Sequence, residues 1–174
     1  LIGNLFGNTV VQLNTGSATL PAFGTATTNP YGLGDVGSFA SPSFADIDGD
    51  GDLDELVAFG ARSFSIWNGN TGKIVYDSKN DVDKKTYELG TYDDKRSDDK
   101  GSEPEAVVTA KIGNQDILFV GLERSDAFMT YDVTNPASPQ YLQTVKTGDA
   151  PEGILFIPAS KSPTKRSLLV VSSE

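Results

Sequence analysis

Turn-forming residues interrupt this sequence every few positions, and that spacing limits what the chain can fold into. The 174 residues include 18 glycines and 9 prolines, and the apolar segments between them are short and rich in β-branched and aromatic residues. Such segments favour strands, because a helix needs an apolar stripe sustained over several turns. The sequence therefore predicts an all-β fold. The expected strands lie at residues 9–13, 55–59, 63–67, 73–76, 106–110, 117–120, 128–133, 141–145, 153–157 and 168–171.

One segment recurs at a fixed distance. The pair Pro104-Glu105 is followed 47 residues later by Pro151-Glu152, and each pair leads through a strand, a turn and a second strand to Glu123 or Glu174. Periods of about 40 to 50 residues with several short strands are typical of β-propeller blades. We therefore expect about three to four blades, in a larger propeller or in one that other domains or chains complete. A β-sandwich with coincidental Pro-Glu turns is the alternative.

The ionisable residues exclude several kinds of site. The sequence contains no cysteine and no histidine, so it has no disulfide, no Ser-His-Asp triad and no metal centre of those ligands. The formal net charge of −10 disfavours nucleic acid and favours cations as partners. No apolar run approaches the roughly 20 residues of a membrane span. Because the first residues resemble the middle of a strand, we expect a longer precursor with a signal peptide.

A run of aspartates is the clearest candidate site. Asp46, Asp48, Asp50 and Asp54 stand at positions 1, 3, 5 and 9 of one loop, and Asp52 offers its backbone carbonyl at position 7. Alternating oxygen ligands around a glycine turn suit Ca²⁺, and the bound cation removes the repulsion among the carboxylates. The flanking segments look like two strands of a hairpin, so we expect a strand-to-strand calcium site and not a helical EF-hand. A solvated acidic turn is the alternative.

The segment that contains this loop resembles a known repeat. Residues 29–54, NPYGLGDVGSFASPSFADIDGDGDLD, are similar to the integrin-type FG-GAP or VCBS repeats of bacterial surface proteins. This resemblance implies that residues 1–60 form one such calcium-binding repeat. It also implies that Asp46, Asp48, Asp50 and Asp54 bind calcium through their side chains, and Asp52 through its carbonyl.

A second resemblance covers the rest of the chain. The phrases ELVAFGARSFSIWNGNTGKIVYDS, RSDDKGSEPEAV, LFVGLERSDAFMTYDVTNPASPQYL and PEGILFIPASKSP are similar to the choice-of-anchor I proteins. These are secreted, propeller-like proteins that resemble mesenchyme-specific surface glycoproteins, and some relatives carry an alkaline phosphatase label. The resemblance implies propeller blades over residues 61–174. The segment from 81 to 92 looks shorter than in that family, and Ser125-Asp126-Ala127 replaces a more glycine-rich turn.

Residues 93–103 are dense in both signs of charge. Arg96 and Lys100 are candidates for binding an anion, and Asp98, Asp99 and Glu103 for holding a metal. A histidine-free phosphoesterase would need such groups. The alternative is a solvated loop with weak surface ion pairs.

The repeated glutamates form another candidate set. Glu105, Glu123, Glu152 and Glu174 stand at equivalent positions, so in a propeller we expect them on one face. Such a ring would bind cations or a basic ligand, or it would brace the blades by accepting backbone N–H groups. Arg124 is placed to neutralise Glu123. The strand aromatics are expected to pack in the core; they are Trp67, Tyr76, Phe119, Phe128 and Tyr131.

These features predict a calcium-binding, non-enzymatic β-propeller module of a secreted or cell-surface protein, with no catalytic residues and Ca²⁺ as its cofactor. The expected roles are adhesion, matrix assembly or recognition of a protein or glycan. Extracellular calcium modules bind at roughly 10⁻⁴ to 10⁻³ M, which suits that compartment. The alternative is a calcium-dependent phosphoesterase that uses the charged groups of residues 93–105 and the glutamate ring.

Overall fold

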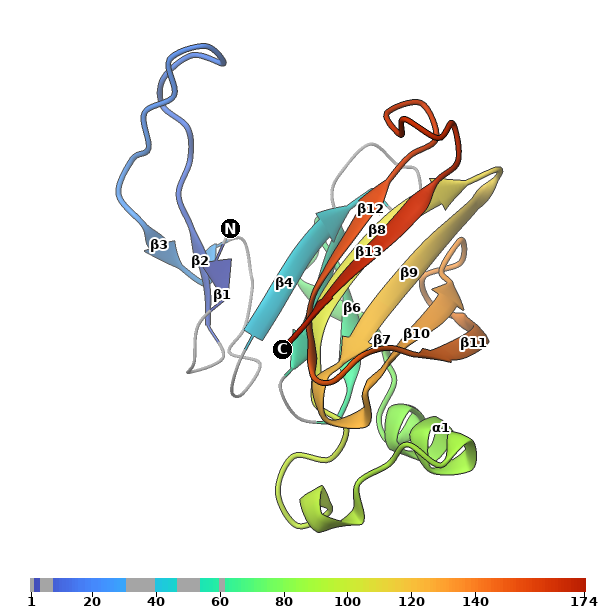
Figure 1. Ribbon diagram of the computed structural model, residues 1–174. Coiled ribbons are helices and arrows are strands. Elements are labelled where there is room, and N and C mark those ends of the chain that lie inside the picture. Colours follow the sequence, from blue (N-terminus) through green and yellow to red (C-terminus); the bar gives the residue numbers. More distant parts are fainter. Residues whose placement is uncertain (1, 4–7, 31–39, 47–53, 60–61) are drawn as a thin grey trace.

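The computed structural model describes residues 2–3, 8–30, 40–46, 54–59 and 62–174. Within them the chain is mostly β-strand with one α-helix, and the strands form separate antiparallel sheets (Figure 1). A small N-terminal sheet has the order β1-β2-β3. Its strands are β1 (Ile2–Gly3), β2 (Thr9–Val11) and β3 (Thr27–Thr28).

A four-stranded meander follows, in which each strand pairs with the next along the chain. Its strands are β4 (Ala40–Ala45), β5 (Asp54–Phe59), β6 (Phe64–Asn68) and β7 (Lys73–Asp77). Ala45 pairs with Asp54 at the end of the β4–β5 hairpin. The expected hairpin around the aspartate loop is therefore confirmed.

A second meander and a two-stranded sheet complete the strands. The meander consists of β8 (Pro104–Ile112), β9 (Gln115–Leu122), β10 (Ala127–Asp132) and β11 (Gln140–Lys146). The two-stranded sheet consists of β12 (Pro151–Ile157) and β13 (Leu168–Ser173). Each of the ten strands expected from the sequence overlaps one of the observed strands, namely β2, β5 to β7 or β8 to β13. The prediction of a mostly-β chain is therefore confirmed.

The two-residue period of β9 sends its side chains into two different cores. Leu118, Val120 and Leu122 are fully buried in the first core, which also holds Phe64 and Ile66 of β6. The first core therefore lies between the β4–β7 and β8–β11 meanders.

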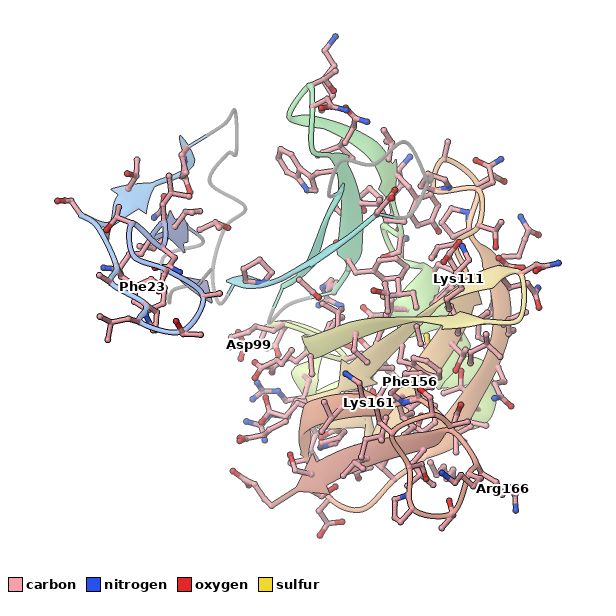
Figure 2. The ribbon with its side chains drawn as sticks, turned by 90° about the horizontal axis from the view of Figure 1, so that it is seen from above. Phe23, Asp99, Lys111, Phe156, Lys161 and Arg166 are labelled. Carbon is pink, nitrogen blue, oxygen red and sulfur yellow. The ribbon has the colours of Figure 1, made fainter. Side chains whose placement is uncertain are left out.

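The opposite face of β9 packs against β12 and β13. Ile117 and Phe119 are buried there with Ile154, Phe156 and Leu169 against them. The rings of Phe119 and Phe156 are stacked with centroids 6.2 Å apart, and Figure 2 shows Phe156 between β12 and the β8–β11 sheet. A side chain at Gly121 would place its Cβ 3.0 Å from the Cδ1 atom of Ile154, so glycine permits this close approach. Strand β9 is thus covered on both faces.

The expected aromatic packing is confirmed for the largest rings. Tyr131 is 1% exposed and its ring meets Phe64 edge-on at 5.0 Å. Phe119 is buried, while Tyr76 and Phe128 are partly buried at the edges of the two cores. Trp67 is half-buried on β6.

The two Pro-Glu hairpins have the same register. Pro104 pairs with Leu122 and Ala106 with Gly121, with a bulge between the two pairs. In the second hairpin, Pro151 pairs with Ser173 and Gly153 with Ser172, again with a bulge between. Glu105 and Glu152 are the extra residues of these bulges, so the equivalence of the two hairpins is confirmed. Their place near a propeller axis stays a prediction.

The all-β prediction needs one correction, because residues 81–89 form a helix. Helix α1 (Asp81–Leu89) begins with Asp81 and Asp83 in its first turn and ends at Gly90, whose φ of 77° is left-handed. Acidic residues near the N-terminus and glycine after the last turn favour a helix. Its buried side chains are Val82 and Thr86, so its apolar face is too small to show in the sequence pattern.

Candidate functional site: a buried glutamate cluster and an aspartate hairpin

The aspartate loop connects β4 to β5. Asp46 is exposed directly after β4, and Asp54 begins β5. Because Ala45 pairs with Asp54, the hairpin brings the backbone of the first and last expected ligands close together. Asp48, Asp50 and Asp52 lie outside the described residues, so their role as calcium ligands stays a prediction.

A second acidic group, the glutamate cluster, consists of Glu103, Glu105 and Glu123. One carboxylate oxygen from each residue lies within 4.8 Å of the other two. Glu103 is 1% exposed and Glu123 is 6% exposed. Charged side chains are seldom buried this deeply unless partners compensate them.

The backbone around the β8–β9 hairpin assembles this cluster. Glu103 precedes β8 with a left-handed φ of 50°, and Glu105 is the bulged residue of β8. Glu123 follows β9 in a short 3₁₀ helix, Glu123–Ser125. The N–H of Glu123 donates to the carbonyl of Glu103 at 2.9 Å, so one backbone hydrogen bond joins the two ends of the hairpin.

Three cations surround Glu103. The Arg96 guanidinium donates to its Oε1 atom, and Lys100 Nζ lies 3.3 Å from its Oε2 atom. Arg124 Nε lies 3.7 Å from Glu103 Oε1, and its Nη2 atom pairs with Glu123 Oε1 at 2.6 Å. Arg124 therefore neutralises Glu123, as expected. A buried carboxylate with several partners of this kind loses little by leaving water.

Glu105 is the least compensated member of the glutamate cluster. Burial first, and then the neighbouring charge of Glu123, raise the pKa of Glu105 to about 7 from its ordinary 4.5. The carboxyl of Glu105 therefore holds its proton to a higher pH than an ordinary glutamate does.

Helix α1 holds Ser102, the residue before Glu103, in place through hydrogen bonds. Asp83 accepts hydrogen bonds from the Ser102 backbone N–H at 3.1 Å and from its hydroxyl at 2.8 Å. The other Asp83 oxygen pairs with Arg62 at 2.6 Å. Sequence reasoning missed this support, although Asn80 before the segment and Gly90 after it are helix-end signals.

The structure brings together only some of the sequence candidates. Glu105 and Glu123 do meet, joined by Glu103, while Glu152 is exposed on the next hairpin and Glu174 is exposed after β13. Asp98 and Asp99 are exposed and lie outside the glutamate cluster. The charge of Arg96 and Lys100 is directed at Glu103. An anion bound by these two cations would have to compete with a buried carboxylate.

The donor set of the glutamate cluster suits protons better than a divalent metal. Three carboxyls face three cations, namely Arg96, Lys100 and Arg124. A divalent ion would have to bind beside these three cations, whose positive charges oppose it. The ion pairs of Glu103 and Glu123 therefore brace the two ends of the β8–β9 hairpin.

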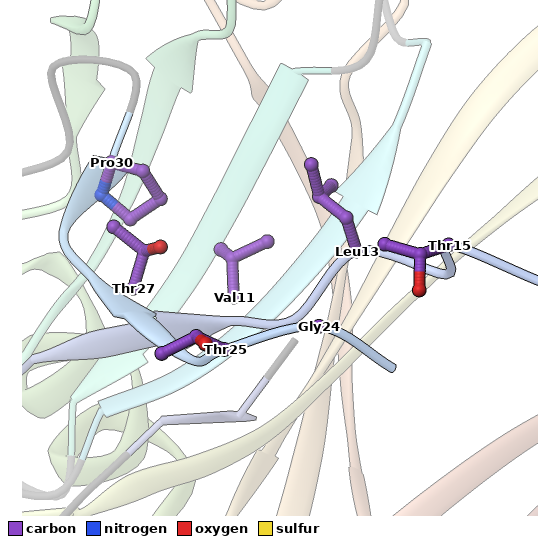
Figure 3. Close-up of a pocket in the computed structure, with 7 residues that line it drawn as sticks. All are labelled: Val11, Leu13, Thr15, Gly24, Thr25, Thr27 and Pro30. Carbon is purple, nitrogen blue, oxygen red and sulfur yellow. The ribbon is translucent and has the colours of Figure 1, made fainter. Parts of the chain in front are cut away.

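A shallow groove of about 210 Å³ lies on the N-terminal sheet (Figure 3). Its lining includes no charged side chain: Val11, Leu13, Thr15, Gly24, Thr25, Thr27 and Pro30. Leu13 is 58% exposed at this surface. Because the groove lacks titratable groups, it offers no acid–base or metal chemistry.

Comparison of this sequence with known proteins shows the family to which it belongs. The family model of the choice-of-anchor I domain matches residues 6–136. Gigasin-3a of Magallana gigas is 28% identical over 157 residues, which cover 71% of this chain and 55% of that protein. The chain thus spans about half the length of this curated relative. The FG-GAP or VCBS repeat over residues 1–60 stays a prediction.

Within the part of the chain that the structure describes, no helix is long and apolar enough to cross a membrane. The matched range covers most of the sequence and includes both the β4–β5 hairpin and the glutamate cluster. The chain therefore belongs to the choice-of-anchor I domain family, and this membership indicates a cell-surface or extracellular protein.

Proposed function

We propose that this chain is a calcium-binding module of a secreted or cell-surface protein, built from propeller-type blades and used in adhesion, matrix assembly or recognition of a protein or glycan. Calcium held between β4 and β5 stiffens the first blade. The blades then present a fixed surface to the ligand.

One observation supports the calcium site above all. The β4–β5 register pairs Ala45 with Asp54, so the chain reverses direction between Asp46 and Asp54. The aspartates of this loop are spaced to direct several oxygens at one point, and hard cations such as Ca²⁺ take six to eight oxygen ligands. Without a cation, the same carboxylates repel one another within a single turn.

The packing of the sheets supports the propeller-type arrangement. The β4–β7 and β8–β11 meanders and the β12–β13 hairpin follow one another in sequence and pack face to face through the two cores. The shared bulge at Glu105 and Glu152 indicates that the second and third sheets begin in the same way. Repeated units stacked on their neighbours are the construction of propellers.

Titration calorimetry with CaCl₂ tests the calcium site directly. The chain is expected to bind one Ca²⁺ with an affinity of roughly 10⁻⁴ to 10⁻³ M. Asp50→Asn keeps the size of the side chain and removes a ligand charge, so it is expected to abolish the binding heat. Asp98→Asn changes an exposed aspartate outside the loop and is the matched control. Equal calcium binding by both variants would rule out the aspartate loop as the site.

A further inference from the structure

The turn between β12 and β13 carries positive charge and no negative charge. Lys161, Lys165 and Arg166 lie close together in the sequence, and no aspartate or glutamate occurs from residue 153 to residue 173. The whole chain, by contrast, has a formal net charge of −10. This turn is therefore a local cationic surface on an acidic protein. We call residues 158–167 the basic loop.

The three cations of the basic loop have no carboxylate partner in the part of the chain that the structure describes. All three side chains are exposed, and none of the ion pairs among the described residues involves them. Arg96, Lys100 and Arg124, in contrast, are held by the glutamate cluster. Cations that are not already paired attract an anionic ligand, because no neighbouring carboxylate has to be displaced first.

Hydrogen bonds give the basic loop a defined shape. Ser162 is 2% exposed, and its hydroxyl shares a hydrogen bond with that of Thr164 at 2.8 Å. The N–H of Ser162 donates to the carbonyl of Pro158 at 3.0 Å, and the N–H of Lys165 donates to the carbonyl of Ser162 at 3.1 Å. Figure 2 shows Arg166 directed away from the sheets. A loop that is ordered before binding loses less entropy when a ligand binds.

The basic loop lies at the same end of the molecule as the β4–β5 hairpin. Figure 1 shows β4, β8 and β12 pointing the same way, so Ala45, the last residue of β4, lies at the end where the basic loop follows β12. A hairpin turn lies at the end of its sheet and not at its side, so a further strand beside β13 leaves this loop exposed. The proposed Ca²⁺ would reduce the negative charge at this end, which otherwise repels an anion.

We propose that the basic loop binds an anionic polysaccharide, one with sulfate or carboxylate groups, through Lys161, Lys165 and Arg166. The proposal rests on the recognition role proposed above and names its ligand class. Three cations spread over one turn match a chain of repeated anionic groups better than a single small ion. The Arg166 guanidinium can bind sulfate or carboxylate through two parallel hydrogen bonds, and the exposed hydroxyl of Ser160 can donate to a sugar.

The composition of the basic loop favours a glycan over an acidic protein segment. Protein interfaces are anchored by aromatic or large apolar side chains that become buried. Residues 158–167 consist only of proline, alanine, serine, threonine, lysine and arginine. Such a surface has charges and hydroxyl groups for a hydrated polyanion but no apolar anchor for a protein.

Binding of the 174-residue chain to immobilised heparin, measured by surface plasmon resonance in millimolar CaCl₂, is the test. The expected result is saturable binding that weakens with NaCl, with a slope of log Kd against log salt of about 2 to 3 for three charge contacts. Lys161→Gln, Lys165→Gln and Arg166→Gln combined are expected to weaken binding about tenfold or more. Failure of the parent chain to bind would overturn the proposal.

A matched variant separates the basic loop from net charge. Lys79→Gln, Lys84→Gln and Lys95→Gln combined remove the same charge from exposed lysines elsewhere, and this variant is expected to bind heparin nearly as the parent chain does. Equal affinities of the two triple variants would overturn the proposal.

Two polymers with one carboxylate per unit test the ligand class. Polygalacturonate is expected to bind more tightly than poly-L-glutamate of matched length, and the reverse order would overturn the proposal in favour of an acidic polypeptide. The basic-loop variant is expected to keep the calcium-binding heat of the parent chain, because its substitutions lie outside the aspartate loop. Loss of glycan binding is thereby distinguished from failure of the calcium site.

Discussion

Glu105 and Glu123 meet at the base of the β8–β9 hairpin, where one carboxyl oxygen of each lies within 4.8 Å of the other and of Glu103. The repeated Pro-Glu corner therefore has a different environment in each hairpin, because Glu152 is exposed. The same bulge places Glu105 inside a cluster of carboxyls and Glu152 in solvent. This difference makes the first corner sensitive to pH.

The first prediction concerns pH and stability. Burial, and then Glu123, raise the pKa of Glu105 to about 7 in the folded chain, above its ordinary 4.5. The folded state therefore holds the proton more tightly than the unfolded state, so this stabilisation is full below about pH 4.5 and is lost as pH rises towards 7. Glu105→Gln mimics the protonated form, and it is expected to raise the thermal midpoint above pH 7 and to remove this dependence.

Thermal melts from pH 4 to 8.5 check the effect by comparing each variant with the parent chain at every pH. Glu152→Gln is the control, because its side chain is exposed at the equivalent bulge and it is expected to follow the parent curve. If Glu105→Gln also follows the parent curve between pH 5 and 7.5, the pKa of Glu105 is not raised in the folded chain.

The second prediction concerns the ion pairs of Glu103. Its 1% exposed carboxylate is contacted by Arg96 and Lys100. Glu103→Gln leaves these cations without their counter-charge and is expected to lower the free energy of unfolding by about 3 kcal/mol. Glu88→Gln removes an exposed pair with Lys85 at 3.5 Å and is expected to cost less than about 1 kcal/mol. Urea unfolding measures both, and equal losses would show that Glu103 is not the centre of the network.

The third prediction concerns the first core. Phe64 is fully buried, and its ring lies 5.0 Å from Tyr131 and 5.8 Å from Tyr76. Phe64→Ala opens a cavity between the two meanders and is expected to lower the free energy of unfolding by about 3 to 5 kcal/mol. Phe23→Ala removes a ring that is 65% exposed and is expected to leave it nearly unchanged. A small loss for Phe64→Ala, measured by urea unfolding, would contradict the packing of these sheets.

Local patterns made much of the fold predictable. Short apolar runs that contain β-branched residues, such as Leu168 to Val171, identify strands through their residue types alone, and the Pro-Glu repeat located two equivalent hairpins. The sequence did not predict helix α1, because the helix buries only Val82 and Thr86. Threonine is polar, so these two residues do not form an apolar stripe that the sequence pattern could show. The end signals at Asn80 and Gly90 were the information available for it.

The site was predictable residue by residue but not as a group. Glu105 and Glu123 were identified from the repeat, and Glu103 from the charged loop. Their meeting depends on the left-handed backbone of Glu103 and on the bulge at Glu105. Non-local geometry of this kind leaves no periodic trace in a sequence. The same holds for Arg62, which reaches Asp83 across 21 residues.

Calcium-dependent stability tests the proposed function most directly. A ligand that binds only the folded state stabilises it in proportion to the logarithm of its concentration. Millimolar CaCl₂ is therefore expected to raise the thermal midpoint of the parent chain, and excess chelator to lower it. Asp46→Ala and Asp50→Ala are each expected to remove this response. An identical melting curve in calcium and in chelator would contradict the account and leave the aspartate loop as an acidic turn.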